Sequence, residues 1–487
     1  VSDSSRPLEK VATKNLDALR LYSLGLERVA KGQFAEAINF YDEALKIDPQ
    51  FASAHLSIAL VLNSAGRNAE ARKEIELALA AADRLTDRDR LLGEAWLATV
   101  TSSSEAVRKW KVLSDAYPDF SAGAGGYAYF AWQLENRYDD DVFAKANVSA
   151  SRQNPKRGPA VHLLGILNLG VERYADALLN FDDAEAGGVS FKPYHAATLV
   201  ALRRYDDAAK LLPARPETFD RNAVLGTMNE LLRVAIPLAR GDWAGTSAAL
   251  SAAHSIAQAP VGFDAALNVT ELALFEPPSA EAAARIRTLL DDARTRWRAG
   301  DADHAASDAG IVLLYAWLDA RVGAAAAAAD AVAEIERGAG AVLDSAVLAA
   351  LRSVAKAQIA LAQDRPAEAV ALLRPLLDGR EPCLAHAVLL DAYTKQGDAA
   401  QAEQQARWLT AHPGRAFAEY GLDKALMPFD VAQSRLAALA LAELAAKRGD
   451  LAVARREFDR FERDWRAAGA PPALLARVAA LQSRVSP

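Results

Sequence analysis

A repeated spacing of small and aromatic residues in the N-terminal third of the chain constrains its fold more than any other feature. The segment 18–51 carries Leu24, Gly25, Ala37, Tyr41, Ala44 and Pro49. Ala71 then follows Ala37 after about 34 residues, the length of one short helix-turn-helix repeat. Small side chains let two helices cross closely, an aromatic side chain fills the wedge between them, and proline ends the second helix. The spacing therefore predicts stacked helical hairpins.

The same pattern weakens along the chain and then returns. Between residues 158 and 191 it is restored by Leu164, Gly165, Tyr174, Ala177, Phe181 and Ala184. Weaker helical pairs can be read through most of the remainder, which predicts about ten to twelve repeats. Apolar residues recur with helical spacing, and no sustained period-two alternation indicates strands. We therefore expect an all-α chain built as a solenoid of helix-turn-helix repeats.

The residues of 18–51 match six of the eight signature positions of the tetratricopeptide repeat (TPR), so the N-terminal third resembles a TPR protein. The stretch 19–97 is also similar to the C-terminal repeat regions of bacterial multidomain regulators. In those proteins the repeats follow a winged-helix DNA-binding, cyclase or protein-kinase module. The resemblance implies a TPR-like superhelix that holds a protein partner.

Breaks rich in proline and glycine suggest how the chain is divided. The segments 212–216 and 379–382 are the strongest such breaks. We expect an N-terminal segment 1–17, an N-terminal TPR array 18–212, central degenerate helical repeats 213–378, and C-terminal helical repeats with a capping helix 379–487. The chain starts without methionine or an apolar leader, which suggests a region cut from a longer polypeptide.

Charge and hydropathy narrow the classes of ligand. The net charge of -7 argues against direct binding of nucleic acid, because phosphate binding needs an excess of Lys and Arg. No apolar run approaches the length of about 18 residues that a membrane helix needs. We therefore expect a soluble region, cytoplasmic or periplasmic, that binds a protein or peptide. The sequence leaves its oligomeric state open.

Candidate catalytic and metal-binding groups lack the companions that their chemistry requires. Ser353 and Lys356 have the SxxK spacing of acyl-transfer nucleophiles, but no KTG element accompanies them. Asp301, Asp303, His304 and Asp308 cluster without the glycine and bidentate glutamate of a calcium loop. The single cysteine, Cys383, is read as a small core residue. We expect no enzymatic activity, no cofactor and no metal.

The TPR resemblance places a partner groove on the face formed by the first helix of each repeat. On this chain the inward positions give Tyr22, Leu26, Leu56, Leu60, Asn63, Arg88, Leu91, His162 and Ile166. This surface is mostly apolar and suits an extended or helical peptide. Neighbouring helices or the N-terminal segment could cover it instead, since large apolar surfaces in monomers are usually buried.

Three functions remain open from the sequence. The first is a protein-interaction scaffold or sensory region of a bacterial regulatory protein. The second is an adaptor for envelope or secretion assembly. The third, an enzyme built on helical repeats, needs a convergent polar site that the sequence does not display.

Overall fold

The computed structural model describes residues 13–485 except 102–103, 217, 220–223, 277–278, 301–303 and 466–468. Within these residues the chain is helical, and the one pair of residues in β geometry is the isolated bridge between Thr218 and Ala257. The predicted all-α, TPR-like solenoid is confirmed. The chain forms two compact units, Val1–Phe130 and Ala131–Pro487.

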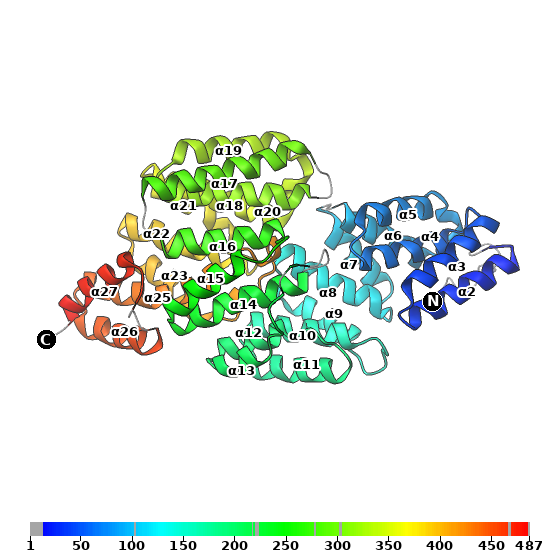
Figure 1. The fold of residues 1–487 in the computed structure, drawn as a ribbon, viewed down its shortest axis with the longest axis horizontal. Coiled ribbons are helices and arrows are strands. Elements are labelled where there is room, and N and C mark those ends of the chain that lie inside the picture. Colours follow the sequence, from blue (N-terminus) through cyan, green and yellow to red (C-terminus); the bar gives the residue numbers. More distant parts are fainter. Residues whose placement is uncertain are drawn as a thin grey trace. The chain divides into compact units, whose positions relative to one another are not determined.

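The first unit consists of helical hairpins and ends within α8 (Figure 1). Its elements are α2 (Leu16–Ala30), α3 (Phe34–Ile47), α4 (Ala52–Ser64), α5 (Asn68–Ala80), η1 (Ala82–Arg84), α6 (Asp87–Val100), α7 (Ala106–Ala116) and α8 (Ser121–Glu135). Each of the pairs α2/α3, α4/α5 and α6/α7 packs as a hairpin. The repeat pattern thus gives the predicted hairpins.

The second unit continues with paired helices and ends in a single helix. Its elements are α9 (Asp140–Ser149), α10 (Gly158–Gly170), α11 (Tyr174–Ala186), α12 (Pro193–Ala201), α13 (Tyr205–Lys210), α14 (Val224–Arg240), α15 (Trp243–His254), α16 (Val261–Leu274), α17 (Ala280–Ala299), α18 (Ala305–Arg321), α19 (Ala325–Gly338), η2 (Gly340–Asp344), α20 (Ala346–Ala362), α21 (Pro366–Leu373), η3 (Arg374–Leu376), α22 (Cys383–Gln396), α23 (Ala399–Ala411), α24 (Arg415–Ala418), η4 (Leu422–Lys424), α25 (Met427–Arg448), α26 (Leu451–Asp464) and α27 (Pro472–Val485). The boundaries expected near 212 and 378 fall in loops inside this unit and stay predictions about sub-arrays. No helix among the described residues is long and apolar enough to cross a membrane.

Helices pair closely because a glycine on one faces an aromatic ring on the other. A Cβ atom added to Gly25 would lie 2.3 Å from the ring of Tyr41, and one added to Gly165 would lie 2.5 Å from the ring of Phe181. Both rings are buried. The two hairpins are far apart in sequence, yet the same small residue makes room for the same aromatic wedge.

The turn between the paired helices uses the left-handed backbone conformation. Gly32 and Gly66 both have φ of 72° in this turn, where glycine meets no Cβ clash. At the corresponding turns after α8 and α10 the left-handed residues are Asn136, with φ of 53°, and Glu172, with φ of 64°. A glutamate in this conformation is strained by about 1 kcal/mol or more. We therefore expect the Glu172 side chain to make a stabilising contact that offsets this cost.

The carboxylate of Asp48 joins three segments of the first unit. It accepts hydrogen bonds from Thr13 Oγ1 at 2.6 Å, from Arg84 Nη2 at 2.5 Å and from the backbone N–H of Gln50 at 3.2 Å. The bond from Arg84 is the main cause that lowers the pKa of Asp48 to about 2. The interaction therefore ties the chain before α2 and the turn after α3 to η1.

We predict that Ala37→Leu destabilises the first hairpin by about 1–3 kcal/mol, because Ala37 is fully buried at the helix crossing and extra methylene groups would overpack it. Hydrogen exchange measured by mass spectrometry should show faster exchange of peptides from α2 and α3. Ala30→Leu, on the exposed end of α2, is the matched control. Equal exchange in the two variants would contradict the helix register.

We predict that Asp48→Asn lowers the free energy of unfolding of the first unit, within the full chain, by about 1–2 kcal/mol near neutral pH. The folded pKa of Asp48 is about 2, below the ordinary value of 3.8, so the stabilisation is present above pH 4 and is lost as the pH falls towards 2. Urea titrations of both proteins across this range provide the measurement. A difference that stays constant with pH would show that the ionised carboxylate is not its source.

Candidate functional site

The predicted groove residue Tyr22 bridges the first two repeats rather than standing free in a groove. Its ring centroid lies 5.5 Å from that of Tyr41 and 4.9 Å from that of Phe51. Its hydroxyl lies 3.2 Å from Ser57 Oγ. Burial raises the pKa of the Tyr22 hydroxyl. Tyr22 therefore acts mainly in packing α2 against α4.

Other predicted groove residues of the first unit differ in accessibility. Leu56 is only 6% exposed, and a Cβ added to Gly93 of α6 would lie 3.7 Å from its Cδ1 atom, so α6 covers it. By contrast, Leu26 is 46% exposed. The accessible members, which we call the open face, are Leu26, Leu60, Asn63, Arg88 and Leu91.

The open face combines apolar side chains with polar groups. Leu60, Asn63 and Leu91 are half-buried, while Arg88 is exposed and its guanidinium lies 4.8 Å from the ring centroid of Phe120. The side chains of Leu60 and Leu91 therefore keep part of their surface in contact with solvent. The open face can therefore contribute apolar contacts to a partner.

The remaining two predicted groove residues, His162 and Ile166, lie on α10 in the second unit and are packed internally. Ile166 is 3% exposed. The His162 ring lies at steep angles of 56–70° to the rings of Phe181, Phe191 and Tyr194, and burial lowers its pKa to about 4. The nine predicted residues are thus divided between the two units, with seven in the first and two in the second.

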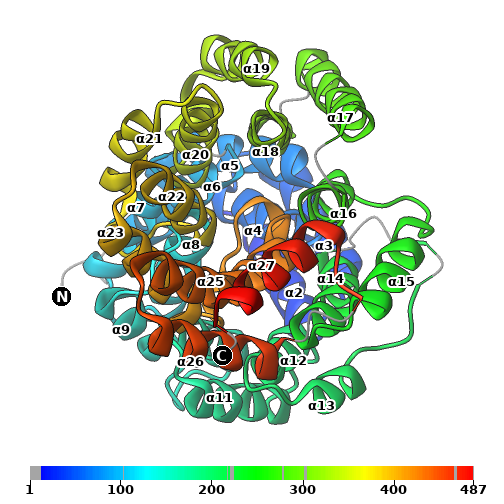
Figure 2. The same cartoon turned by 90° about the vertical axis from the view of Figure 1, so that its left-hand side faces the viewer.

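The concave side of the second unit is occupied by its own chain. The segment 414–448, here called the interior segment, comprises α24, η4 and α25. Helix α24 packs against α10 and α12, η4 packs against α16 and α18, and α25 packs against α14, α16, α22 and α23. Figure 2 shows α25 inside the curve that the surrounding helices form. A C-terminal segment thus covers the concave side of the second unit. Residues 1–12 of the N-terminal segment, which the sequence suggests as a cover for the groove, lie outside the described residues.

Glu172 holds the start of the interior segment. Its carboxylate accepts hydrogen bonds from the backbone N–H groups of Gly414, at 3.1 Å, and Arg415, at 3.2 Å. These groups begin α24, where backbone N–H groups have no helical acceptor. A Cβ added to Gly414 would lie 2.3 Å from the carbonyl oxygen of Leu169, so this approach requires glycine. Burial raises the pKa of Glu172, and the bonds that it accepts oppose that rise.

Lys424 fixes the middle of the interior segment from within. Its Nζ atom donates to the carbonyl oxygen of Phe417 at 2.7 Å and to that of Glu419. Three aromatic rings surround the ammonium group, with centroid distances of 4.8 Å for Tyr194 and 5.8 Å for both Trp132 and Tyr420. Burial lowers the pKa of Lys424, while the carbonyls and ring faces stabilise its charged form.

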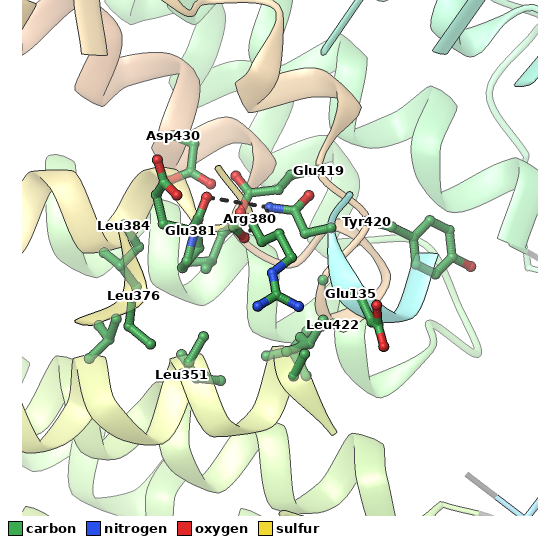
Figure 3. Close-up of a pocket in the computed structure, with 18 of the residues that line it drawn as sticks. Glu135, Leu351, Leu376, Arg380, Glu381, Leu384, Glu419, Tyr420, Leu422 and Asp430 are labelled. Atoms are coloured by element: carbon green, nitrogen blue, oxygen red, sulfur yellow. Dashed lines mark hydrogen bonds between the residues drawn. The ribbon is translucent and has the colours of Figure 1, made fainter. Parts of the chain in front are cut away.

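A cavity of about 280 Å³ remains between the interior segment, α20 and the loop before α22. Its wall is mostly apolar, and Figure 3 shows Leu351 and Leu422 at the end opposite Asp430 and Glu419. Glu381 also lies at the acidic end. The cavity therefore has an apolar part and an acidic part, a combination typical of small-molecule sites.

The acidic groups differ in protonation. Burial raises the pKa values of Glu419 and Asp430, which favours their protonated forms. Glu381 is also buried, yet hydrogen bonds from His386 and from the backbone N–H of Gly379 lower its pKa to about 2. Glu381 is therefore the member of the group whose ionised form is favoured near neutral pH.

Thiol and carboxyl groups at the acidic end of the cavity are chemically able to bind a metal ion. Among the described residues, Cys383, Glu419 and Asp430 place one potential ligand atom each within 4.8 Å of one another. However, Glu419 already accepts the backbone N–H of Cys383 at 3.1 Å, and the positive charges of Arg415 and Lys424 act on it. These interactions disfavour a further cation bound directly at Glu419.

The motif residues of the sequence analysis have structural partners. Ser353 Oγ donates to the carbonyl of Ala349, and Lys356 Nζ donates to Glu336, so the two are not bonded to each other. Asp308 is buried in the first turn of α18, whereas Asp301 and Asp303 lie outside the described residues. Cys383 is 2% exposed, as expected for a core residue.

Comparisons with known proteins agree with the repeat pattern. The family model described as TPR repeat matches residues 25–66. The APC/C hetero-tetramer Cut9-Hcn1 is similar at 12% identity, with 96% of this chain and 84% of that chain covered and a TM-score of 0.36. Yeast Tom70 is similar at 13% identity, with 96% and 95% covered and a TM-score of 0.28. PilW, a type IV pilus biogenesis factor, is similar at 16% identity, with 50% and 94% covered and a TM-score of 0.27. No curated protein sequence matches the chain.

We predict that Glu172→Ala loosens the interior segment, because two backbone N–H groups would lose their acceptor at a loss of about 1–3 kcal/mol. Limited trypsin digestion, followed by mass spectrometry, should detect faster cleavage after Arg415 and Lys424, which are both buried. Asp182→Ala, at an exposed carboxylate on α11, is the control. Unchanged cleavage at both sites in Glu172→Ala would show that Glu172 does not hold the segment.

Proposed function

We propose that the first unit, in which residues 25–66 match the TPR repeat, is a protein-interaction module that binds an extended or helical peptide on the open face. The repeat family is a scaffold for protein–protein contacts. The partner would bind to the first helices of successive repeats, α2, α4 and α6. It concerns the first unit alone.

The observation that carries the proposal is the accessibility of apolar side chains on adjacent repeats. Leu26 on α2, Leu60 on α4 and Leu91 on α6 all keep contact with solvent. The bond between Tyr22 and Ser57 and the proximity of Leu56 to Gly93 keep these three helices side by side. Exposed apolar side chains on adjacent helices are the kind of surface that an amphipathic or extended segment can contact with its apolar anchors.

Polar groups on the open face would set the orientation of the bound peptide. Arg88 supplies a positive charge, and Asn63 supplies an amide that can donate and accept hydrogen bonds. Each apolar anchor of the partner would contribute about 1.5–3 kcal/mol when buried. A few leucines would therefore dominate affinity.

The biological context is a finer proposal. We infer that the scaffold serves a bacterial regulatory protein, because the stretch 19–97 is similar to the repeat regions of such regulators. Sequencing the complete reading frame would test this context directly. A DNA-binding, cyclase or kinase module in the same polypeptide supports it, and a cleavable signal peptide would favour an envelope or secretion adaptor instead.

We predict that a photo-crosslinking amino acid at position 60 captures the partner in cells, and that adding Leu26→Asp reduces this crosslink at least tenfold, since a buried charge disfavours apolar docking. Position 77 provides the matched control, because Leu77 is 50% exposed but lies on the second helix of its repeat. Helical circular dichroism should be unchanged. Equal capture at positions 60 and 77, or no effect of Leu26→Asp, would place the partner elsewhere.

A further inference from the structure

The cavity of the second unit contains two buried acceptors without hydrogen-bond partners. Asp430 is 3% exposed and Asn136 is 8% exposed, and Oδ1 of each has no partner among the described residues. Both residues line the cavity. The amide of Asn136 is oriented by its Nδ2 atom, which donates to the carbonyl of Arg380 at 2.9 Å, so Oδ1 remains the acceptor. Buried acceptors of this kind are normally satisfied.

One end of the cavity is lined by carboxyl groups. Glu381, Glu419 and Asp430 contribute carboxyl groups to one end of the wall. The cations that also line the cavity are engaged elsewhere, since Lys424 donates to the backbone and Arg380 donates to Asp378 at 2.9 Å. A ligand with an ammonium group would supply the donor that Asp430 and Asn136 lack, and its charge would favour the ionised form of Asp430.

The rest of the cavity selects for an apolar body. Leu351, Leu376 and Leu422 line the part away from Glu419 and Asp430 (Figure 3). The volume of about 280 Å³ suits a small organic molecule. A bare metal ion would occupy only the acidic end and would leave this apolar volume unfilled.

We propose that this cavity binds a small organic cation, in which an ammonium group donates hydrogen bonds to Asp430 and Asn136 and an apolar body lies against Leu351, Leu376 and Leu422. The cavity lies entirely in the second unit, so the site is independent of the peptide-binding open face. Hydrogen bonds between an ammonium group and a carboxylate are among the stronger ones that proteins form. The second unit is thus a receptor for an amine.

Three probes that share a phenyl group and differ little in size separate charge from shape. They are 2-phenylethylamine, which is a cation, 2-phenylethanol, which is neutral, and 3-phenylpropionate, which is an anion. Isothermal titration calorimetry with the full chain should give at least tenfold tighter binding of the amine than of the alcohol, with no binding of the propionate. Equal binding of the amine and the alcohol would overturn the proposal.

Asp430→Asn tests the proposed acceptor with little disturbance of the fold, because it replaces a buried carboxyl group by a neutral group of the same shape. We expect at least tenfold weaker binding of 2-phenylethylamine, with helical circular dichroism unchanged. Asp330→Asn, at an exposed carboxylate on α19, should bind like the unchanged chain. The same affinity in both variants would remove Asp430 from the site.

Ala350→Phe tests the location, because Ala350 lines the cavity and is only partly buried. The larger side chain should fill the volume and abolish binding of 2-phenylethylamine. Retained binding would place the amine elsewhere and overturn the proposal. Tight binding of Zn²⁺ that is lost in Cys383→Ala would also overturn it, since the acidic end would then be a metal site.

Discussion

The close crossing of each helix pair over a small residue is the interaction on which the rest of the structure depends. Gly25 leaves room for the ring of Tyr41, and Gly165 leaves room for the ring of Phe181. Stacking such wedges turns a row of hairpins gradually, as repeat proteins do. In the second unit this curvature creates an inner apolar face that the chain covers with α25. The interior segment, and the cavity beside it, therefore follow from the local packing of the hairpins.

The sequence predicts the features that depend on neighbouring residues. The all-α class, the repeated hairpins, the turn at Gly32 and the burial of Ala37 are confirmed, because each is set by contacts within one repeat. The interior segment could not be predicted in this way. Its helices have ordinary repeat composition, and its position depends on contacts such as that between Glu172 and Gly414, which lie 242 residues apart.

The candidate sites show the same limit. The repeat register indicates which side chains lie on the face of the first helices, but it does not indicate which of them the next helix covers, as α6 covers Leu56. The cavity combines Asn136 with Asp430, which no local pattern connects. One signal was present: Asn136 and Glu172 stand in the turn where Gly32 and Gly66 provide a left-handed residue. Both side chains make long-range hydrogen bonds, Asn136 to Arg380 and Glu172 to Gly414.

Amide hydrogen exchange of the interior segment tests the central claim, that the second unit encloses part of its own chain, most directly. Helix α24 spans only Arg415–Ala418, and so short a helix has no appreciable stability of its own in water. The account predicts that the amides of Phe417 and Lys424 exchange as slowly as those in the centre of α10. Exchange of these amides at the rate of an unstructured chain would contradict it.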